Sequence, residues 1–565
     1  MEEWNIILLI FWMPNHTLRC TNLQVWIYFS YYLFYIPFLF FGGFFMIIKK
    51  IFSLLFSILL IFSFSCKQNV EPVNPNPTPD NPPSVNPPDT DVTISYPSFS
   101  PIGGFYKEKQ TVTITCDNST AIYYTILKQT LDEQGNWDEQ AWQEAIASSI
   151  PTENSTKYTG PFEISEQCII RAMAVKSDGT KNYAMTCFDF DLDRSTDFVN
   201  VGGSINPTNP ESINWQDQTI YFILTDRFFN GDPSNDKSPN LVDKDGNPYD
   251  ESIVLPGQPA SGYNGGDIEG VRQKLQYIKD LGFTAIWLTP PVKCQVAESN
   301  YHGFHGYWAS DFTKVDPHMG TMEQYQQFVK EAHDMGLYVI QDIVVNHCGD
   351  YQKITKPITE SDLKENQGNI SNDDFYLEPK SIPFSHPEQL PWALNHINNL
   401  TPDEFKYNAF YHYNPGIADY TNKSIMHTYS SSDLDDIATE NPVVRNLLRG
   451  YFRYWIDKVG IDGYRIDTVK YVEPDFFEDF INSTEPNNMG VREYAHSIGK
   501  TDFINFGEAW DSNESLVGSY SQSENGTPRI DGMIYFSGKK GLQMSQFVTV
   551  KITDCVDNNL IGEIV

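Results

Sequence analysis

The stretch Gly460-Ile-Asp-Gly-Tyr-Arg-Ile-Asp467 decides the fold, because it places a short apolar run directly after a well-formed helical pattern. In residues 441–459, Asn441 suits the N-cap and Pro442 the first turn, and apolar side chains then recur at helical spacing. The run that follows is expected to be a strand that ends at Asp467. A short apolar strand with polar groups at its end, directly after a helix, is typical of a barrel that keeps its chemistry at the carboxyl ends of its strands.

Two other segments are expected to end in polar groups in the same way. Leu337–His347 is a near-continuous apolar strand that terminates in Asn346 and His347, and Phe503–Trp510 is a short strand that delivers Glu508 at its end. Taken alone, a polar residue at the end of a strand is more often a cap or a turn former than a catalytic group. Three such strands in one chain indicate a single shared rim.

Three motifs in these strands resemble the first three conserved regions of the α-amylase family of glycoside hydrolases (family 13): Asp342-Ile-Val-Val-Asn-His347, Gly463-Tyr-Arg-Ile-Asp467 and Phe506-Gly-Glu508. Their order and spacing are those of the family. Two further strings, Phe304-His-Gly-Tyr-Trp308 and Asp433-Leu-Asp435, are similar to other motifs of the family. The resemblance implies a retaining α-1,4-glucan hydrolase that acts on starch or related oligosaccharides.

By this resemblance Asp467 would be the nucleophile and Glu508 the general acid and base, since retaining cleavage needs two carboxyl groups roughly 5 Å apart. Arg465 lies two residues before Asp467 and therefore on the same side of the strand, where it could keep that carboxylate ionised and oriented. It could also be a buried structural ion-pair partner, or both. The other residues expected to bind the sugar are His305, Tyr307, Asp342, His347 and Lys470.

A loop rich in oxygen donors predicts a calcium site, because a hard cation prefers clustered carboxylate, amide and carbonyl oxygens. Without the resemblance this loop would be taken as an Asx-rich turn. By resemblance to a site near the first strand of many bacterial members, the ligands would be Asn230, Asp232, Asn235, Asp236, Gly265 and Asp267. A second Ca²⁺, between the barrel and an inserted domain, would use Asn346, Asp433 and a backbone carbonyl just after Lys470.

The predicted fold class is α/β: a (β/α)8 TIM-type barrel with a small inserted domain after strand 3, preceded by an immunoglobulin-like β-sandwich. The barrel is assigned to residues 213–347 and 433–536, with one helix expected at Ile268–Leu281, and the inserted domain to 348–432, which is too long for a loop. Residues 93–193 show short alternating runs separated by turn residues, as in a sandwich. Whether this module binds glucan or spaces the catalytic domain stays open.

The resemblance stops after Phe536, and the barrel is expected to lack about its last two strands. The family's fourth region is an Asn-His-Asp, whereas Val556-Asp-Asn-Asn-Leu560 lacks both the histidine and the final aspartate. We therefore expect residues 537–565 to be a non-homologous tail that results from a truncated or frameshifted reading frame. The missing third carboxylate leaves two alternatives open: a catalytically impaired starch-binding lipoprotein, and a related glucan transferase or pullulan-type hydrolase.

The N-terminal region predicts export. Residues 46–66 have a basic start, an apolar run and small residues before Cys66, as in a bacterial lipoprotein signal peptide, and residues 67–92 form a linker rich in Pro and Asn. The protein is then expected to be lipid-anchored through Cys66 in the outer membrane or at the cell surface. Residues 1–45 are expected to be a spurious extension before the true start, with a membrane-spanning anchor as the rival interpretation.

Composition excludes one class of partner. The chain has 565 residues and a formal net charge of −34, so it would repel the phosphates of nucleic acid, and no such partner is expected. The 8 cysteines show no CxxC or metal-binding spacing, so no zinc site is expected and their pairing stays open.

Overall fold

The computed structural model describes residues 95–128, 139–191, 213–236, 262–298, 301–365, 375–377, 400–432, 434–509, 511, 513–535, 550–556 and 559–564, all within one compact unit. The predicted extension, the signal peptide with Cys66 and the linker up to residue 92 lie outside this range, as does most of the predicted tail. Among the helices of the described ranges, none has both the length and the apolar character needed to span a membrane.

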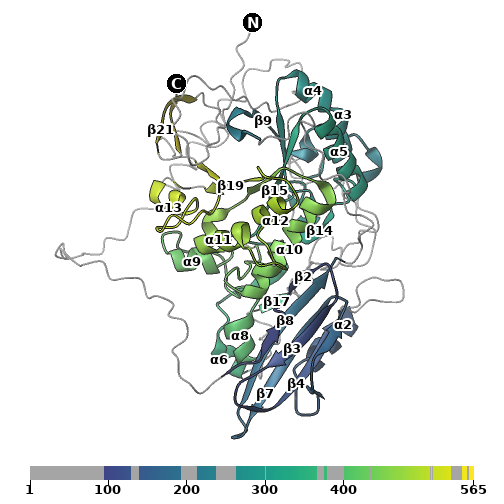
Figure 1. Cartoon of the computed structure of the whole chain (residues 1–565), viewed down its shortest axis with the longest axis vertical. Coiled ribbons are helices and arrows are strands. Elements are labelled where there is room, and N and C mark those ends of the chain that lie inside the picture. The colour runs from purple at the N-terminus through teal and green to yellow at the C-terminus, as the bar shows by residue number, and fades with distance from the viewer. Residues whose placement is uncertain are drawn as a thin grey trace, which may run out of the picture. The chain divides into compact units, whose positions relative to one another are not determined.

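A parallel sheet of six strands forms the barrel part of the molecule (Figure 1). Its spatial order, β9-β10-β15-β18-β19-β20, is also the order along the chain, and each neighbouring pair is parallel. The strands are β9 (Ile220–Ile223), β10 (Ala285–Leu288), β15 (Tyr338–Ile343), β18 (Gly463–Ile466), β19 (Ile504–Ala509) and β20 (Gly532–Tyr535). Consecutive parallel strands joined by crossovers are the building pattern of a (β/α)8 barrel, so this part of the predicted architecture is observed over six strands.

Strand β15 is shorter than predicted. The sequence indicated a strand over Leu337–His347, but the sheet pairing ends at Ile343, which lies level with Ile466 of β18. His347 forms an isolated bridge with Asp436 instead. The apolar run continues past the strand because these residues are buried under the following segment, and burial alone does not distinguish a strand from a packed loop.

Helix α10 (Pro442–Val459) is the best-defined helix and begins and ends where the sequence predicts. The Asn441 side chain accepts a hydrogen bond from the backbone N–H of Val443, and Gly460 closes the helix at a φ of 78°. Helices α10, α11 and α12 pack against one another beside the sheet (Figure 1). The other helices of the barrel part are α3 (Ile268–Gln273), α4 (Leu275–Asp280), α5 (Met322–Asp334), α11 (Pro474–Asn482), α12 (Val491–Ser497) and α13 (Glu514–Ser519).

The single helix predicted over Ile268–Leu281 is wrong, because it is broken at Lys274 into α3 and α4. Lys274 has a ψ of 7° and its backbone N–H bonds to the carbonyl of Val271, which is one residue closer than in a regular α-helix. The buried side chains nevertheless keep helical spacing across the break, so the sequence pattern does not reveal it.

Two sheets precede the barrel. One has the order β1-β3-β6 and the other β2-β8-β7-β4-β5, and they share a core that includes Val112, Ile114, Ile170 and Phe188. Two sheets around one core form a sandwich, while the immunoglobulin-like class stays a prediction. The elements are β1 (Ser98–Ser100), β2 (Gly104–Tyr106), β3 (Gln110–Thr115), β4 (Ser119–Lys128), α2 (Glu139–Ser148), β5 (Thr156–Lys157), β6 (Phe162–Ile164), β7 (Cys168–Lys176) and β8 (Lys181–Phe190).

The sandwich packs directly on helix α10. A Cβ added at Gly450 would lie 2.3 Å from the Cβ of Phe105, so the absence of a side chain at Gly450 allows strand β2 to approach the helix this closely. On the same helix, the hydroxyl of Tyr451 donates to Asp189 of β8 over 2.9 Å. The sandwich therefore belongs to the same folded unit as the barrel strands and helices.

The predicted inserted region contains short elements between β15 and α10. They are β16 (Gln352–Ile354), α6 (Glu360–Glu365), β17 (Phe375–Leu377), α8 (Pro402–Asn408) and α9 (Lys423–Thr428). The remaining short strands are β11 (Val292–Cys294), β12 (Ala297–Glu298), β13 (Tyr301–His302), β14 (Ala309–Val315), β21 (Val550–Val556) and β22 (Asn559–Ile564). The cysteines within the described ranges that are free thiols are Cys116, Cys168, Cys187, Cys294 and Cys348.

Candidate active site

The register of the parallel sheet brings the predicted catalytic residues together. Asp342 of β15 lies level with Arg465 of β18, and Arg465 lies level with Phe506 of β19, two residues before Glu508. Asp467 follows the end of β18, where its backbone N–H donates to the carbonyl of Ile343 over 2.9 Å. Neighbouring parallel strands end at the same edge, so their polar groups converge at one site.

Arg465 is the centre of this site. Its Nη1 lies 3.0 Å from Oδ1 of Asp342 and 2.7 Å from Oδ1 of Asp467, and its Nη2 lies 3.5 Å from Oε2 of Glu508. Only 8% of the Arg465 side chain is exposed, so these contacts are poorly screened by water. Arg465 thus contacts Asp467 and also belongs to a buried ion-pair cluster, so the geometry is compatible with both roles considered for it.

Asp342 is fully buried and fixes the aromatic wall of the site. Its Oδ2 accepts hydrogen bonds from the indole Nε1 of Trp287 over 3.0 Å and from the hydroxyl of Tyr307 over 2.9 Å. The guanidinium of Arg465 lies 5.3 Å from the ring centroid of Trp287 and 5.9 Å from that of Tyr307. Trp287 was not predicted from the sequence, where its one signal was its place near the end of the second barrel strand.

The two histidines of the site are held neutral. Burial lowers the pKa of His305 to about 4 and also lowers the pKa of His347, although the charge of Asp467 acts in the opposite direction on both. The Nδ1 of His305 accepts from the backbone N–H of Tyr307 over 3.1 Å, which leaves its Nε2 as the protonated nitrogen. Nδ1 of His347 lies 3.0 Å from Oδ1 of Asn346, and its Nε2 is buried with no hydrogen-bond partner in the described part of the chain. The Nε2 atom of His347 is therefore a polar atom that a ligand could engage.

Glu508 has the environment of a general acid. Burial and the neighbouring charge of Asp467 raise its pKa, while Arg465 and the backbone N–H of Thr468, 3.3 Å from Oε2, act in the opposite direction. Thr468 adopts a φ of 50°, in the left-handed region that non-glycine residues rarely occupy. Backbone strain of this kind costs about 1–3 kcal/mol and often accompanies functional sites. No residue pattern indicated this conformation directly after Asp467.

Lys470 lies on the same rim, in the short 3-10 helix Val469–Tyr471. Its Nζ is 3.6 Å from Oδ2 of Asp511 and 5.4 Å from the ring centroid of Tyr471. Asp511 follows strand β19, and the sequence analysis did not identify it. The ammonium group is thus held near the end of the strand that carries Glu508.

The first predicted calcium loop brings three of its six residues, Asn230, Asp236 and Gly265, into mutual contact. Nδ2 of Asn230 lies 2.6 Å from Oδ1 of Asp236, and a Cβ at Gly265 would lie within 2.7 Å of both side chains. The Oδ1 atoms of Asn230 and Asn235 are buried and have no hydrogen-bond partner within the described ranges. Orphaned buried oxygens beside a carboxylate are the chemistry that Ca²⁺ would satisfy, so these residues fit the ion.

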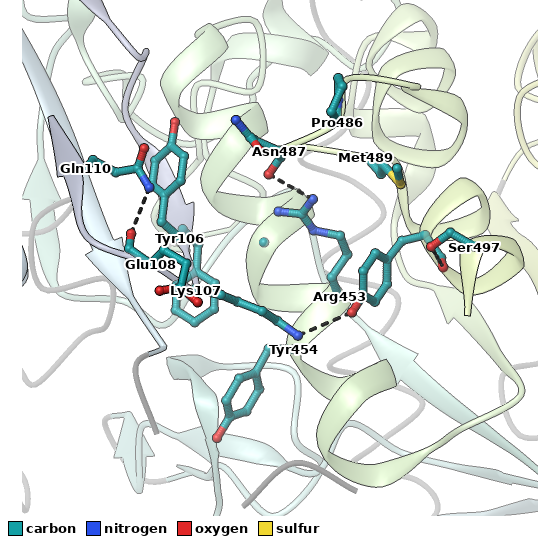
Figure 2. Close-up of a pocket in the computed structure, with 13 residues that line it drawn as sticks. Tyr106, Lys107, Glu108, Gln110, Arg453, Tyr454, Pro486, Asn487, Met489 and Ser497 are labelled. Carbon is teal, nitrogen blue, oxygen red and sulfur yellow. Dashed lines mark hydrogen bonds between the residues drawn. The ribbon is translucent and has the colours of Figure 1, made fainter. Parts of the chain in front are cut away.

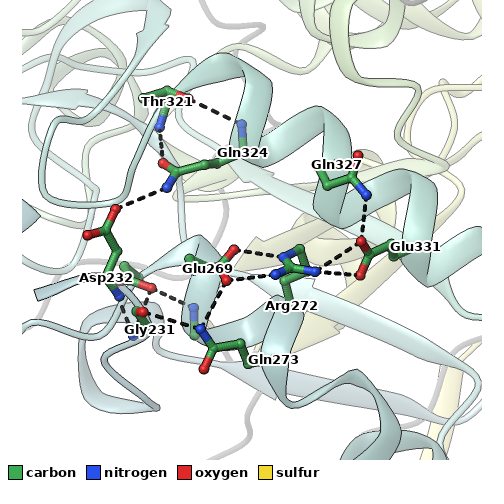
Figure 3. Close-up of polar contacts among 11 residues, drawn as sticks. Gly231, Asp232, Glu269, Arg272, Gln273, Thr321, Gln324, Gln327 and Glu331 are labelled. Atoms are coloured by element: carbon green, nitrogen blue, oxygen red, sulfur yellow. Dashed lines mark hydrogen bonds and ion pairs between the residues drawn. The ribbon is translucent and has the colours of Figure 1, made fainter.

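The other two predicted ligands hold the loop in place. Asp232 accepts from the backbone and hydroxyl of Ser234 and, over 3.1 Å, from Nε2 of Gln324 on helix α5 (Figure 3). Asp267 caps helix α3 and accepts from the backbone N–H of Asp232 over 2.8 Å. Within the described residues, no group of three or more His, Cys, Asp or Glu side chains that could hold a metal ion occurs.

The second predicted calcium site is partly assembled. Nδ2 of Asn346 lies 3.3 Å from the carbonyl oxygen of Tyr471, the residue just after Lys470, and 2.9 Å from Oδ1 of Asp436. Asp433 lies outside the described residues. Asp436, which the sequence analysis missed, stands next to Asn346.

A partly buried histidine accompanies Asp436. Burial alone would lower the pKa of His412, but hydrogen bonds to Asp436 and Glu440 outweigh it and raise that pKa to about 10. Nδ1 of His412 lies 2.6 Å from Asp436, and Nε2 lies 2.9 Å from Glu440. This cationic ring offsets part of the negative charge between the barrel and the inserted segment.

Comparison with known proteins finds relatives of both parts of the chain. A family profile described as "Alpha amylase, catalytic domain" matches residues 222–549, and one described as "Fn3 associated" matches residues 145–187. A beta/alpha-amylase of Paenibacillus polymyxa is 35% identical over 289 residues, which are 50% of this chain and 19% of the relative. An alpha-amylase of Streptomyces lividans is 31% identical over 277 residues, 46% of this chain and 29% of the relative.

Among solved structures, an Anoxybacillus alpha-amylase shares 30% identity with a TM-score of 0.38, and the match covers 57% of this chain and 53% of that chain. The chain spans less than a third of the length of the two curated relatives named above.

Proposed function

Because the chain belongs to the alpha-amylase family of glycoside hydrolases, we propose that it hydrolyses the α-1,4 bonds of starch or related oligosaccharides with retention of configuration. Asp467 is the nucleophile and Glu508 the general acid and base in this proposal. The observation that supports it best is the contact of one guanidinium, that of Arg465, with the carboxylates of Asp342, Asp467 and Glu508 within 3.5 Å.

The first chemical step uses the opposite protonation of the two carboxyl groups. The guanidinium of Arg465, 2.7 Å from Asp467, stabilises the ionised nucleophile, whereas burial raises the pKa of Glu508 and favours its protonated form. A carboxylate oxygen of Asp467 bonds to the anomeric carbon while the glycosidic bond breaks, and the proton of Glu508 passes to the leaving oxygen. The product of this step is a glycosyl ester on Asp467 and a shortened glucan.

The second step reverses these roles. The carboxylate of Glu508 removes a proton from water, the water oxygen bonds to the anomeric carbon, and the bond to Asp467 breaks. Two inversions give net retention. Both carboxyl groups return to their starting protonation states, so the cycle is complete.

The surrounding groups bind and orient the sugar. Neutral His305 and His347 each offer one ring nitrogen to a sugar hydroxyl. Neither ring takes up a proton near neutral pH, so protonation does not weaken this binding. Tyr307, fixed by its hydrogen bond to Asp342, presents its ring for stacking on the pyranose at the cleavage point. Lys470 reaches the neighbouring sugar.

Glu508→Gln is expected to lower kcat on maltooligosaccharides about 10²–10⁴-fold, because the variant has no proton to give to the leaving oxygen. In the wild type, activity should fall as pH rises through the raised pKa of Glu508, since deprotonation removes the acid. The measurement is kcat/KM against pH for both proteins. The variant should lack this alkaline decline and should recover the first step on an aryl α-glucoside with a good leaving group; an unchanged decline would assign the acid role to another residue.

We also propose that Ca²⁺ binds at the loop of Asn230, Asn235, Asp236 and Gly265, with Asp232 and Asp267 completing the oxygen donors. The ion would act structurally there, by joining the loop after β9 to the start of helix α3. The loop lies next to a network of ion pairs and hydrogen bonds. In this network Arg272 joins Glu269 of α3 to Glu331 of α5 (Figure 3). Asn346, Asp433 and the carbonyl of Tyr471 are proposed for a second ion.

Addition of Ca²⁺ at 100 times its Kd is expected to stabilise the wild type by about 2.7 kcal/mol, and a chelator should reverse the effect. Asp236→Ala should lose this dependence because it removes the carboxylate that lies beside Asn230 and Gly265. The matched control is Asp334→Ala on helix α5, whose side chain is exposed and far from the loop in sequence. Thermal unfolding with and without Ca²⁺ provides the readout; equal calcium dependence in both variants would refute the first site.

A further inference from the structure

Four arginine side chains are buried in the described part of the chain, and one of them differs from the other three in its ion pairing. Three of them pair with carboxylates: Arg171 with Glu404, Arg449 with Asp479 and Glu485, and Arg465 with Asp342, Asp467 and Glu508. Arg453 of helix α10 is 8% exposed and forms no ion pair with any carboxylate in the described residues. A buried charge normally requires a counter-charge, so the ordinary compensation is missing at this position.

The contacts of Arg453 do not replace a counter-ion. Its Nη1 donates to the backbone carbonyl of Asn487 over 3.2 Å, and its guanidinium lies 5.7 Å from the ring centroid of Tyr494. Burial and the like charge of Arg449, one turn away on α10, lower the pKa of Arg453 to about 10. The side chain therefore remains a cation at neutral pH, in surroundings that disfavour the charge.

Arg453 lines a cavity of about 260 Å³ between the sandwich and the barrel (Figure 2). One wall comes from β2 and the turn after it, with Tyr106 and Lys107, and the other from α10, the segment 486–489 and α12. Lys107 reaches across to Asp457 of α10, and its Nζ lies 3.2 Å from the hydroxyl of Tyr494. The exposed Glu108 also lies at this cavity, but it makes no ion pair with Arg453.

We propose that this cavity binds a small oxyanion, a carboxylate or phosphate group, on the guanidinium of Arg453. The planar donor fork of arginine matches two oxygens of such a group, and a charge-assisted bidentate contact is stronger in a partly desolvated site than at the surface. The volume holds a phosphate together with ordered water, since one water occupies about 30 Å³. The ligand would supply the counter-charge that Asp or Glu side chains supply to the other three buried arginines.

Two of the aromatic rings of the cavity, those of Tyr494 and Tyr106, already have other partners, which disfavours stacking of a neutral sugar on them. Tyr494 is already in contact with the cations of Lys107 and Arg453, at 5.6 Å and 5.7 Å from its centroid, and Tyr106 stacks on Phe188 at 5.8 Å. Stacking on a pyranose requires a free face of an aromatic ring, whereas binding of an oxyanion requires hydrogen-bond donors. Because the walls belong to the sandwich and to the barrel, a bound anion would also strengthen the contact between the two.

Thermal unfolding of the full chain in inorganic phosphate, against sodium chloride at equal ionic strength, tests the proposal. At a tenfold excess over Kd, phosphate should raise the midpoint of the wild type by about 2–4 °C. Arg453→Met should lose this rise, while the control Arg272→Met, which removes an arginine already paired with Glu269 and Glu331, should keep it. No rise in the wild type, or an equal rise in Arg453→Met, would overturn the proposal.

The stability of the variant without phosphate gives an independent check. Replacing an uncompensated buried cation by an apolar side chain of similar length is expected to leave the midpoint in chloride unchanged or higher. A large fall in that midpoint would show that Arg453 is already compensated and would contradict the proposal. Arg453→Lys keeps the charge but loses the donor fork, so it should bind phosphate at least about tenfold more weakly than the wild type.

Calorimetry with inorganic phosphate, acetate, glucose 6-phosphate and maltose separates the sources of the anion. Binding of phosphate or acetate alone would support a free ion, and tighter binding of glucose 6-phosphate would support an anionic group carried on a sugar. The binding of each anion must be lost in Arg453→Met. Binding of maltose that survives in Arg453→Met, with no binding of the anions, would overturn the proposal in favour of a neutral carbohydrate site.

Discussion

Asp467→Asn is expected to abolish the release of reducing ends from soluble starch, with kcat lowered at least about 10³-fold. The amide is nearly isosteric with the carboxylate but is a poor nucleophile and forms no glycosyl ester that water hydrolyses. Arg465 would also lose one of its three carboxylate partners, the one 2.7 Å from its Nη1. The change therefore acts on the reacting atom and leaves most of the surrounding site in place.

The control for this experiment is Asp475→Asn, because Asp475 lies on the exposed side of helix α11 and its side chain is 63% accessible. The control should keep wild-type activity. Cleavage that survives in Asp467→Asn would refute the assignment of the nucleophile. A wild type that binds starch without cleaving it would support the glucan-binding alternative, and longer or cyclic products lost in Asp467→Asn would support a transferase.

Arg171→Met is expected to destabilise the folded chain by about 3–5 kcal/mol, because it leaves a buried carboxylate without its partner. Arg171 of β7 and Glu404 of α8 are both 0% exposed and are joined by two hydrogen bonds, of 2.8 Å from Nε and 2.6 Å from Nη2. The same glutamate closes the capping box of α8 with Thr401. The pair therefore ties the sandwich to the inserted segment of the barrel.

Denaturant unfolding of a matched series provides the measurement. Lys128→Met breaks the exposed pair of Lys128 and Glu166 and should cost no more than about 1 kcal/mol. The double variant Arg171→Met with Glu404→Leu should recover part of the loss, since it removes both buried charges. A loss in Arg171→Met as small as that in Lys128→Met would contradict a tight junction between the sandwich and the barrel.

The sequence predicted the positions of the site residues on regular elements, while their catalytic roles stay predictions. Asp467 directly follows strand β18, and Glu508 lies near the end of strand β19. Strand order alone brings them to one edge, so each could be placed without knowledge of the other. Helix α10 was predicted to its ends because Asn441 and Gly460 are strong boundary signals.

The contacts that sequence reasoning missed are long-range. Trp287 bonds to Asp342 across 55 positions, and Arg171 meets Glu404 across 233, and no periodic pattern encodes such pairs. The left-handed conformation of Thr468 has no residue signal either, because the usual marker for that region is glycine. The break at Lys274 was hidden because the buried side chains keep helical spacing on both sides of it.

The anomeric configuration of the first product tests the central claim most directly. Two carboxyl groups acting as nucleophile and acid give retention, so proton NMR of maltooligosaccharide hydrolysis should show the α-anomer of the new reducing end first, followed by slow mutarotation. Initial formation of the β-anomer would mean that water attacks the anomeric carbon directly. That result would contradict the role of Asp467 as the nucleophile.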